Sequence, residues 1–255
     1  MISSHNSTPM VSLTNVHKNF GDATVLEGIN FNASKGEFIS LVGPSGCGKS
    51  TLLKIIAGLY SVSQGAIIVD GMQPKDAREE MSFIFQEANL LPWSRVLANT
   101  ELPLKLRGES KAKRSETARK MLDLVNLSHA LELFPWQLSG GMRMRVSIAR
   151  SLTLAPRILL LDEPFGALDE MTRDNLNEDL LRIHAREQWT AFFVTHSAAE
   201  AVFLSNRVVV LSANPGRIAE VIEIDLPEQR TAELREDPAY LNYVAKVSHA
   251  IRTVH

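Results

Sequence analysis

The segment GPSGCGKST has the spacing G-x-x-x-x-G-K-[ST] and lies between an apolar run, FISLVG, and a segment of helical pattern. Glycines at these positions let backbone amides approach phosphate oxygens without a Cβ clash, and the following helix directs its positive end at the same anion. Lys49 would reach the β- and γ-phosphates of a nucleotide, and the Ser50 hydroxyl would ligate Mg²⁺. A chance glycine-rich turn is the alternative, which the strand–loop–helix context disfavours. The phosphate-binding loop predicted here comprises Gly43, Pro44, Ser45, Gly46, Cys47, Gly48, Lys49, Ser50 and Thr51.

Two adjacent carboxylates end a second apolar run, RILLLDEP. In α/β sheets, ligands bind at the carboxyl ends of the parallel strands, which is where these side chains would lie. We expect Asp162 to hold the Mg²⁺ shell through water, and Glu163 to polarise the water that attacks the γ-phosphate. An apolar strand that ends in Asp-Glu is common by itself. The phosphate-binding loop upstream gives this pair its catalytic interpretation.

A third group, the LSGGM segment (Leu138–Met142), opens a helical stretch, MRMRVSIARSL. Ser139, Gly140 and Gly141 form another helix start suited to an anion. One subunit rarely needs two such helix starts for one nucleotide, so the pair favours a site shared between two subunits. Taken alone, the segment is better explained as a capped helix with a glycine-rich lead-in.

The scaffold for these groups alternates between strand and helix patterns. Short apolar runs predict strands between residues 11 and 43, at residues 81–86, and again in RILLLD, TAFFVTH and NRVVVLS. Helical patterns dominate from about residue 89 to residue 150, and a charged helix is expected over residues 170–188. An α/β core interrupted by one helical insertion is the simplest organisation. The tail ends in an amphipathic segment predicted to pack on the core with Leu241, Val244, Val247, Ile251 and Val254.

Composition limits the remaining classes of protein. The chain has 255 residues and a formal net charge of −2, without the basic field expected of a nucleic-acid binder. Its longest apolar runs are too short to cross a bilayer. The first ten residues lack the pattern of a signal peptide and predict a disordered leader. The single cysteine, Cys47, excludes an intramolecular disulfide and fits a reducing cytosol.

The order GPSGCGKST, Gln86, LSGGM, LLLDEP, GALD and THS resembles the ATPase subunits of ABC transporters over about residues 11–227. The resemblance implies an α/β fold: a P-loop NTPase core with an N-terminal antiparallel β-subdomain and an inserted α-helical subdomain. It divides the chain into a leader (1–10), an ABC ATPase domain (11–227) and a C-terminal helical tail (228–255). Within the ATPase domain, the RecA-like core covers 11–88 and 155–227, and the helical subdomain covers about 89–154.

The resemblance also implies roles for individual residues. Phe20, in NFG upstream of the phosphate-binding loop, would stack on adenine, and Gln86 would contact Mg²⁺ and the attacking water while sensing a transmembrane partner. His196 would contact the γ-phosphate and help to hold Glu163. The catalytic set implied is therefore Glu163, His196, Gln86 and Lys49, with Ser50, Gln86 and Asp162 at the metal and ATP as the nucleotide.

Other implied roles concern a second copy of the chain. Ser139, Gly140 and Gly141 would bind the γ-phosphate held by the other subunit, and Asp169, in GALD, would bridge the two subunits. The common Asp after the THS histidine is Ser197 here. Ser197 begins an S-x-x-E pattern, which still predicts a capping box for the next helix.

Several stretches, FQEANLLPW, ELPLKLRG, LSGGM and NPGRI, resemble ATPase subunits of the nitrate/sulfonate/taurine type of bacterial importer. Such a subunit energises uptake of a small solute through a separate permease, on the cytoplasmic face of the inner membrane. Its partners are a second copy of itself, the permease and, indirectly, a periplasmic solute-binding protein, with no nucleic acid. An ABC exporter ATPase and a soluble, non-transport ABC ATPase are the alternatives.

Two further expectations depend on local sequence. Cys47 lies near a helix start and Lys49, where a thiolate is favoured; an inert small filler is the alternative.

Leu90, Leu91 and Trp93 follow Gln86 in a proline-stiffened stretch that, in the family, lines the groove for a permease helix. These side chains could instead seal the core of the helical insertion.

Overall fold

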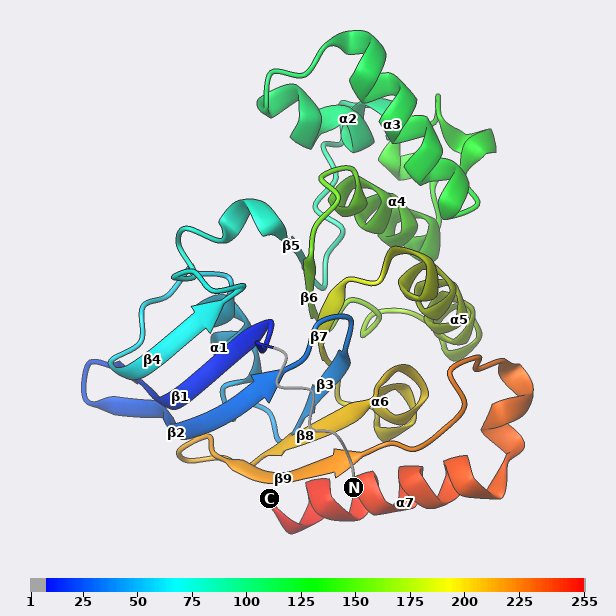
Figure 1. Ribbon diagram of the computed structural model, residues 1–255. Helices are drawn as coiled ribbons and strands as arrows, with labels where there is room; N and C mark the ends of the chain where they lie inside the picture. Colours follow the sequence, from blue (N-terminus) through cyan, green and yellow to red (C-terminus); the bar gives the residue numbers. More distant parts are fainter. Residues whose placement is uncertain (1–7, 255) are drawn as a thin grey trace.

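A six-stranded sheet forms the centre of the computed structural model, which describes residues 8–254 (Figure 1). Its strand order is β5-β6-β7-β3-β8-β9, and the first five of these strands are parallel while β9 runs antiparallel to β8. The parallel order brings the ends of β3 and β6, with the motifs that follow them, to one edge of the sheet. The strands are β3 (Phe38–Val42), β5 (Met81–Ile84), β6 (Ile158–Asp162), β7 (Thr190–Val194), β8 (Arg207–Leu211) and β9 (Ile218–Glu223).

A second, three-stranded antiparallel sheet has the order β2-β1-β4 and carries the first part of the chain. It consists of β1 (Val11–Phe20), β2 (Ala23–Ala33) and β4 (Gln64–Val69). Met10, expected within the disordered leader, is buried, and its amide donates to Ala33 O at 2.7 Å, because it continues the pairing of β1 with β2. Residues 1–7 of the expected leader lie outside the described residues.

Helices α2 (Val96–Leu106), α3 (Lys111–Leu124) and α4 (Gly140–Leu152) form a group at one end of the molecule, green in Figure 1. They occupy the predicted helical stretch, and α4 packs against β5 and α5. The other helices are α1 (Lys49–Ile56), α5 (Glu170–Glu187), α6 (Ala198–Leu204) and α7 (Pro238–Thr253), with short 3-10 helices η1 (Arg78–Glu80), η2 (Ser128–Ala130), η3 (Pro135–Gln137) and η4 (Ala232–Glu236).

The central strands are buried on both faces, as parallel strands covered by helices are. Ile39 and Leu41 of β3 face a core shared with α1 and the three-stranded sheet. Phe38 and Val42 face the opposite core, which includes side chains of α4, α5, α6 and α7. The phosphate-binding loop therefore leaves a strand that is fixed from both sides.

The tail helix α7 packs against α6 and β8, with Tyr240 and Val247 buried. Leu241, expected on the buried stripe, is instead 52% exposed. Tyr240 is buried in its place, because the core-facing stripe of α7 runs through residues 240, 244 and 247. Residue 241 is rotated by about 100° around the helix axis from residue 240 and so points away from the core. None of the helices within residues 8–254 combines the length and the apolarity that a membrane crossing requires.

Candidate functional site

The phosphate-binding loop turns sharply between β3 and α1, and two of its glycines are required by space as well as by conformation. Gly43 and Gly48 have φ values of 147° and 96°. A Cβ atom on Gly43 would lie 2.3 Å from Leu211 O, and one on Gly48 would lie 2.5 Å from Leu26 Cδ2. Within the described chain, no side chain caps the start of α1 and no acidic residue occupies its first turn. The first amides of α1 are therefore available to an anion.

Lys49 lies across this loop and is only 5% exposed. Its Nζ donates to Gly43 O at 2.9 Å and to Pro44 O at 2.8 Å. The ammonium group is thus held inside the curve of the loop. Its contact with the phosphates of a nucleotide stays a prediction.

Cys47 corrects one sequence expectation. The side chain is fully buried, and Lys49 Nζ lies 3.7 Å from its sulfur. Burial raises the pKa of the Cys47 thiol, and this effect outweighs the lysine charge and the hydrogen bonds that favour the thiolate. The expectation of a thiolate is wrong because the sequence shows the nearby lysine but not the burial.

Oxygen atoms suited to Mg²⁺ lie at the end of β6 and the start of α1. The Ser50 hydroxyl donates to Asp162 Oδ1 at 2.7 Å. Burial raises the pKa of Asp162, while the bond from Ser50 acts in the opposite direction. Mg²⁺ prefers oxygen ligands and is commonly held by one or two carboxylates together with substrate phosphates, so the donor set fits the ion.

Glu163 and His196 meet beside the same loop. His196 Nε2 lies 2.7 Å from Glu163 Oε1, and Glu163 adopts a left-handed backbone conformation with φ of 50°. Both side chains line a pocket of about 220 Å³ with Ser45, Lys49 and Ser50. Two separate strand ends, after β6 and after β7, thus deliver a carboxylate and an imidazole to the phosphate-binding loop.

Gln86 reaches the other side of this carboxylate. It follows β5, the edge strand next to β6, and lines a cavity of about 290 Å³ together with Glu163 and His196. Its Nε2 would lie 3.5 Å from a Cβ atom on Gly166, which places the amide against the loop after Glu163. No spacing in the sequence predicts that Gln86 approaches the loop after Glu163, because the order of the strands in the sheet is not visible in the sequence.

The LSGGM segment and Asp169 lie outside the residues that line this pocket, at the starts of α4 and α5. The Ser139 hydroxyl accepts from the amide of Met142 at 3.2 Å, and Asp169 Oδ1 accepts from the amide of Thr172 at 2.9 Å. A Cβ atom on Gly141 would lie 2.6 Å from Thr172 Cγ2, so the starts of α4 and α5 are packed closely. In a single chain these residues do not reach the phosphate-binding loop's pocket.

Phe20 is also outside the residues that line this pocket. It is 44% exposed, its ring meets Tyr60 edge to face, and Lys18 Nζ lies 4.7 Å from the ring centroid. Val25, which no motif in the sequence singles out, does line the pocket. Adenine stacking by Phe20 stays a prediction.

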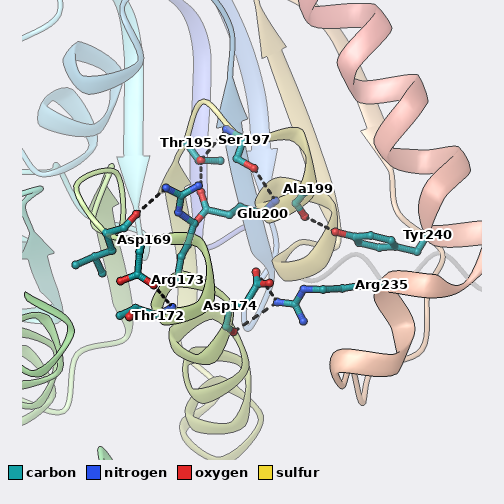
Figure 2. A network of polar contacts seen from close by, with 11 residues as sticks. Asp169, Thr172, Arg173, Asp174, Thr195, Ser197, Ala199, Glu200, Arg235 and Tyr240 are labelled. Carbon is teal, nitrogen blue, oxygen red and sulfur yellow. Dashed lines mark hydrogen bonds and ion pairs between the residues drawn. The ribbon is translucent and has the colours of Figure 1, made fainter.

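A polar network joins Thr195 and Ser197, the neighbours of His196 in the chain, to the starts of α5 and α6, as Figure 2 shows. Glu200 does not complete the expected capping box: its amide donates to Ser197 Oγ, but its carboxylate accepts from Thr195 Oγ1 at 2.5 Å. The reciprocal half of the box is therefore wrong, because Thr195 Oγ1 takes the bond from the Ser197 amide instead. Sequence reasoning overlooked Thr195, and it missed Arg173 at the other end of the network.

Comparison with known proteins adds family and fold. The family model for ABC transporters matches residues 26–166. The chain is 46% identical to an aliphatic sulfonates import ATP-binding protein of Bacillus cereus, over 87% of this chain and 88% of that protein. It is 42% identical to a nitrate import ATP-binding protein of Synechocystis sp., over 91% and 90%. A dimeric ATP-binding cassette bound to ADP and phosphate superposes with a TM-score of 0.74, at 32% identity over 86% of this chain and 100% of that one.

Proposed function

This chain belongs to the ABC transporter family, and from that premise we propose that it drives the import of a small anion such as a sulfonate or nitrate through a separate permease. It is an ATP-binding and ATP-hydrolysing subunit. The names of the sulfonate and nitrate relatives support import and an anionic solute, and they disfavour an exporter or a soluble non-transport ATPase. The observation that best supports ATP hydrolysis is the contact between Glu163 and His196 beside the phosphate-binding loop.

Each residue of the site has a distinct task in the proposed reaction. The loop amides and Lys49 bind the phosphates, and Glu163 accepts a hydrogen bond from the attacking water and directs it at the γ-phosphate. His196 keeps the Glu163 carboxylate in place through their 2.7 Å contact. Ser50, Asp162 and Gln86 would hold Mg²⁺, which supplies positive charge to the phosphate oxygens when it is bound.

We propose that a second copy of the chain completes the site. The LSGGM segment and Asp169 lie outside the pocket of their own chain and are partly open to solvent, so they are free to meet the nucleotide of another copy. The helical part, about 89–154, would then act as the unit that carries the LSGGM segment to the partner. The dimeric form of the ADP-bound cassette supports this arrangement.

The permease contact would lie at the loop before α2. Trp93 is 74% exposed, and its loop is held by the buried Asn99, whose side chain bonds Leu91 N at 2.7 Å and Ser94 O at 2.8 Å. Leu90 is half-buried and packs on the core, so it serves the core more than a partner. A permease bound at this loop would hold the chain at the cytoplasmic face of the membrane. The permease would also link the chain indirectly to a periplasmic solute-binding protein.

The Trp93→Ser variant tests the permease contact against Leu241→Ser, a matched loss of an exposed apolar side chain on α7. Trp93→Ser should keep the melting temperature and ATP turnover of the isolated chain but lower permease co-purification and solute uptake about tenfold or more, the usual loss for a central apolar anchor. Leu241→Ser should leave all four measurements unchanged. Normal uptake with Trp93→Ser would place the docking contact elsewhere.

Glu163→Gln tests the catalytic assignment. The amide keeps the shape of the side chain but cannot act as a base, so ATP turnover should fall at least about 100-fold while ATP affinity stays the same. With ATP bound and uncleaved, size-exclusion chromatography should show a dimer. Glu187→Gln, at the far end of α5, is the control and should turn over ATP normally. Near-normal turnover by Glu163→Gln would overturn the assignment.

A further inference from the structure

The cavity next to Glu163 has a wall that the proposed hydrolysis mechanism does not use. Arg173, Thr195 and Glu200 line it together with Glu163 and His196, and its volume is about 290 Å³. Glu200 is only 7% exposed, although a buried carboxylate is costly unless it is paired or hydrogen-bonded. The partners that compensate for this cost show what the carboxylate does.

Three hydrogen bonds from Glu200 and its neighbours close a ring around His196. Glu200 Oε2 accepts from Thr195 Oγ1 at 2.5 Å, and Thr195 Oγ1 accepts from the amide of Ser197 at 3.0 Å. Ser197 Oγ then accepts from the amide of Glu200 at 3.2 Å. The His196 side chain is 49% exposed, so packing restrains it little. The direction of the imidazole therefore depends mainly on the backbone that this ring holds.

The second oxygen of the same carboxylate faces α5. Glu200 Oε1 lies 3.9 Å from Arg173 Nε, and Arg173 Nη2 donates to Leu168 O at 2.9 Å, next to Asp169 (Figure 2). Neither Arg173 Nε nor Glu200 Oε1 has a hydrogen-bond partner within residues 8–254. Burial raises the pKa of Glu200, against the bond from Thr195 and the charge of Arg173. The two oxygens of Glu200 therefore connect two different segments of the site.

We propose that Glu200 is a positioning residue for His196. Through Thr195 it fixes the backbone of residues 195–197 so that the imidazole meets Glu163, and through Arg173 it ties this segment to the one that carries Asp169. The inference rests on the proposed function, because it assigns a use to the contact between His196 and Glu163. It predicts that the ring of hydrogen bonds affects the chemical step more than nucleotide binding.

A purely structural role for Glu200, as an anchor of α6, makes a different prediction. Tyr240 Oη donates to Ala199 O at 3.0 Å, so Tyr240 anchors the same helix from α7 without touching the ring around His196. The Tyr240→Phe variant therefore loosens α6 and leaves the ring intact. It is the matched control for variants that break the ring.

The experiment compares Thr195→Val, Glu200→Ala, their double variant, Glu200→Gln and Tyr240→Phe. We expect Thr195→Val and Glu200→Ala each to lower kcat for ATP about tenfold or more, with KM within about twofold, because a misplaced reacting group slows chemistry. The double variant should be no worse than either single variant, since both break one interaction. Glu200→Gln, which can still accept from Thr195, should recover part of the loss, and Tyr240→Phe should lower the melting temperature with kcat within about twofold.

A spectroscopic measurement on the nucleotide-free protein separates positioning from general loss of activity. The ¹⁵N resonances of the His196 ring, assigned with His196→Ala, should move towards those of an exposed histidine in Thr195→Val and Glu200→Ala but not in Tyr240→Phe. If Glu200→Ala does not fold, Thr195→Val alone carries the test, because its side chain keeps nearly the same shape. Unchanged kcat and resonances in Thr195→Val, or equal losses in Tyr240→Phe, would overturn the inference.

Glu163→Gln, measured in parallel, distinguishes this failure from failure of the proposed function. Normal turnover by Glu163→Gln would remove the catalytic assignment, whatever the ring variants do. An inactive Glu163→Gln with normal ring variants would leave the catalytic assignment in place and show only that Glu200 does not position His196.

Discussion

The two glycine-rich segments of this chain lead into helices in different ways. At α1 the N-cap is Gly48, with φ of 96°, and within residues 8–254 no side chain caps the helix. At α4 the N-cap is Ser139, whose hydroxyl accepts from the amide of Met142. The start of α1 is open to an anion, whereas the start of α4 is already satisfied by its own chain.

The difference shows why similar sequence patterns can have different tasks. An uncapped helix start is stabilised by the anion that it binds, while a capped one is stable without a ligand. The carbonyls of Gly43 and Pro44 already hold Lys49 inside the phosphate-binding loop. The isolated chain should therefore bind nucleotide at α1 alone, and the LSGGM segment should matter only when a second copy brings its phosphates to α4.

Alanine in place of one glycine in each segment tests this contrast most strongly. Gly48→Ala forces a non-glycine residue to adopt a φ of 96° and sets a Cβ atom 2.5 Å from Cδ2 of the fully buried Leu26, so either the loop or the packed Leu26 side chain must shift. Strain of this kind is worth about 1–3 kcal/mol, or roughly a 5- to 150-fold loss of ATP affinity if binding restores the loop. Gly140→Ala meets only the flexible side chain of Leu168, at 3.0 Å, and should leave affinity within about twofold.

Isothermal titration of each monomeric variant with ATP, at a concentration too low for dimers, measures this difference. Hydrolysis by Gly140→Ala, measured at high protein concentration, should still fall, because the dimer uses the α4 start. Equal losses of affinity in Gly48→Ala and Gly140→Ala would remove the distinction between the two helix starts.

Local patterns predicted most of the scaffold but not the contacts made across it. The apolar runs before Gly43 and before Asp162 are strands of the central sheet, and the charged stretch from Glu170 is α5, because period and polarity are properties of neighbouring residues. The ionisation state of Cys47 was predicted wrongly because the loop at Gly216, distant in sequence, covers it. A Cβ atom on Gly216 would lie 2.1 Å from Cys47 O.

The sequence likewise predicted only part of the hydrogen bonding around His196. The S-x-x-E pattern correctly gave the cap that Ser197 provides to α6. Its acidic residue, Glu200, turns instead to Thr195 and Arg173, and the second of these lies on another helix. The choice between a local and a distant partner depends on the packing of α5 against α6, which no local pattern reports.

Ser139 allows capping to be separated from phosphate binding. Ser139→Ala removes the cap of α4 and should cost about 1 kcal/mol, or roughly 2–4 °C in melting temperature for a chain of this size. Ser139→Asp keeps a good cap and should melt like the parent chain. Both variants should hydrolyse ATP more slowly than the parent, Ser139→Asp the more so, because its carboxylate repels the phosphate of the second copy.

Calorimetry and steady-state turnover supply the two measurements. Ser110→Ala, which removes the cap of α3 and leaves the LSGGM segment unchanged, is the control: it should lower the melting temperature and keep normal turnover. If Ser139→Asp turned over ATP as fast as the parent chain, the start of α4 would be a structural cap only.

The smallest effect concerns thiol reactivity at the two helix starts. Burial raises the pKa of Cys47, so at pH 7 its thiolate fraction is lower than that of a free cysteine. Its rate of reaction with a maleimide should therefore keep rising, about tenfold per pH unit, beyond the ordinary thiol pKa of about 8.5. A thiol at the half-exposed start of α4, from Met142→Cys in a Cys47→Ala background, should level off at or below that pH, because the helix start favours the thiolate. ATP should slow the reaction at Cys47 several-fold in the monomer and leave the Met142→Cys site unchanged. A Cys47 rate that levels off below pH 8.5, or that ATP does not alter, would mean that the loop around α1 opens freely and is not the preformed anion site contrasted here with α4.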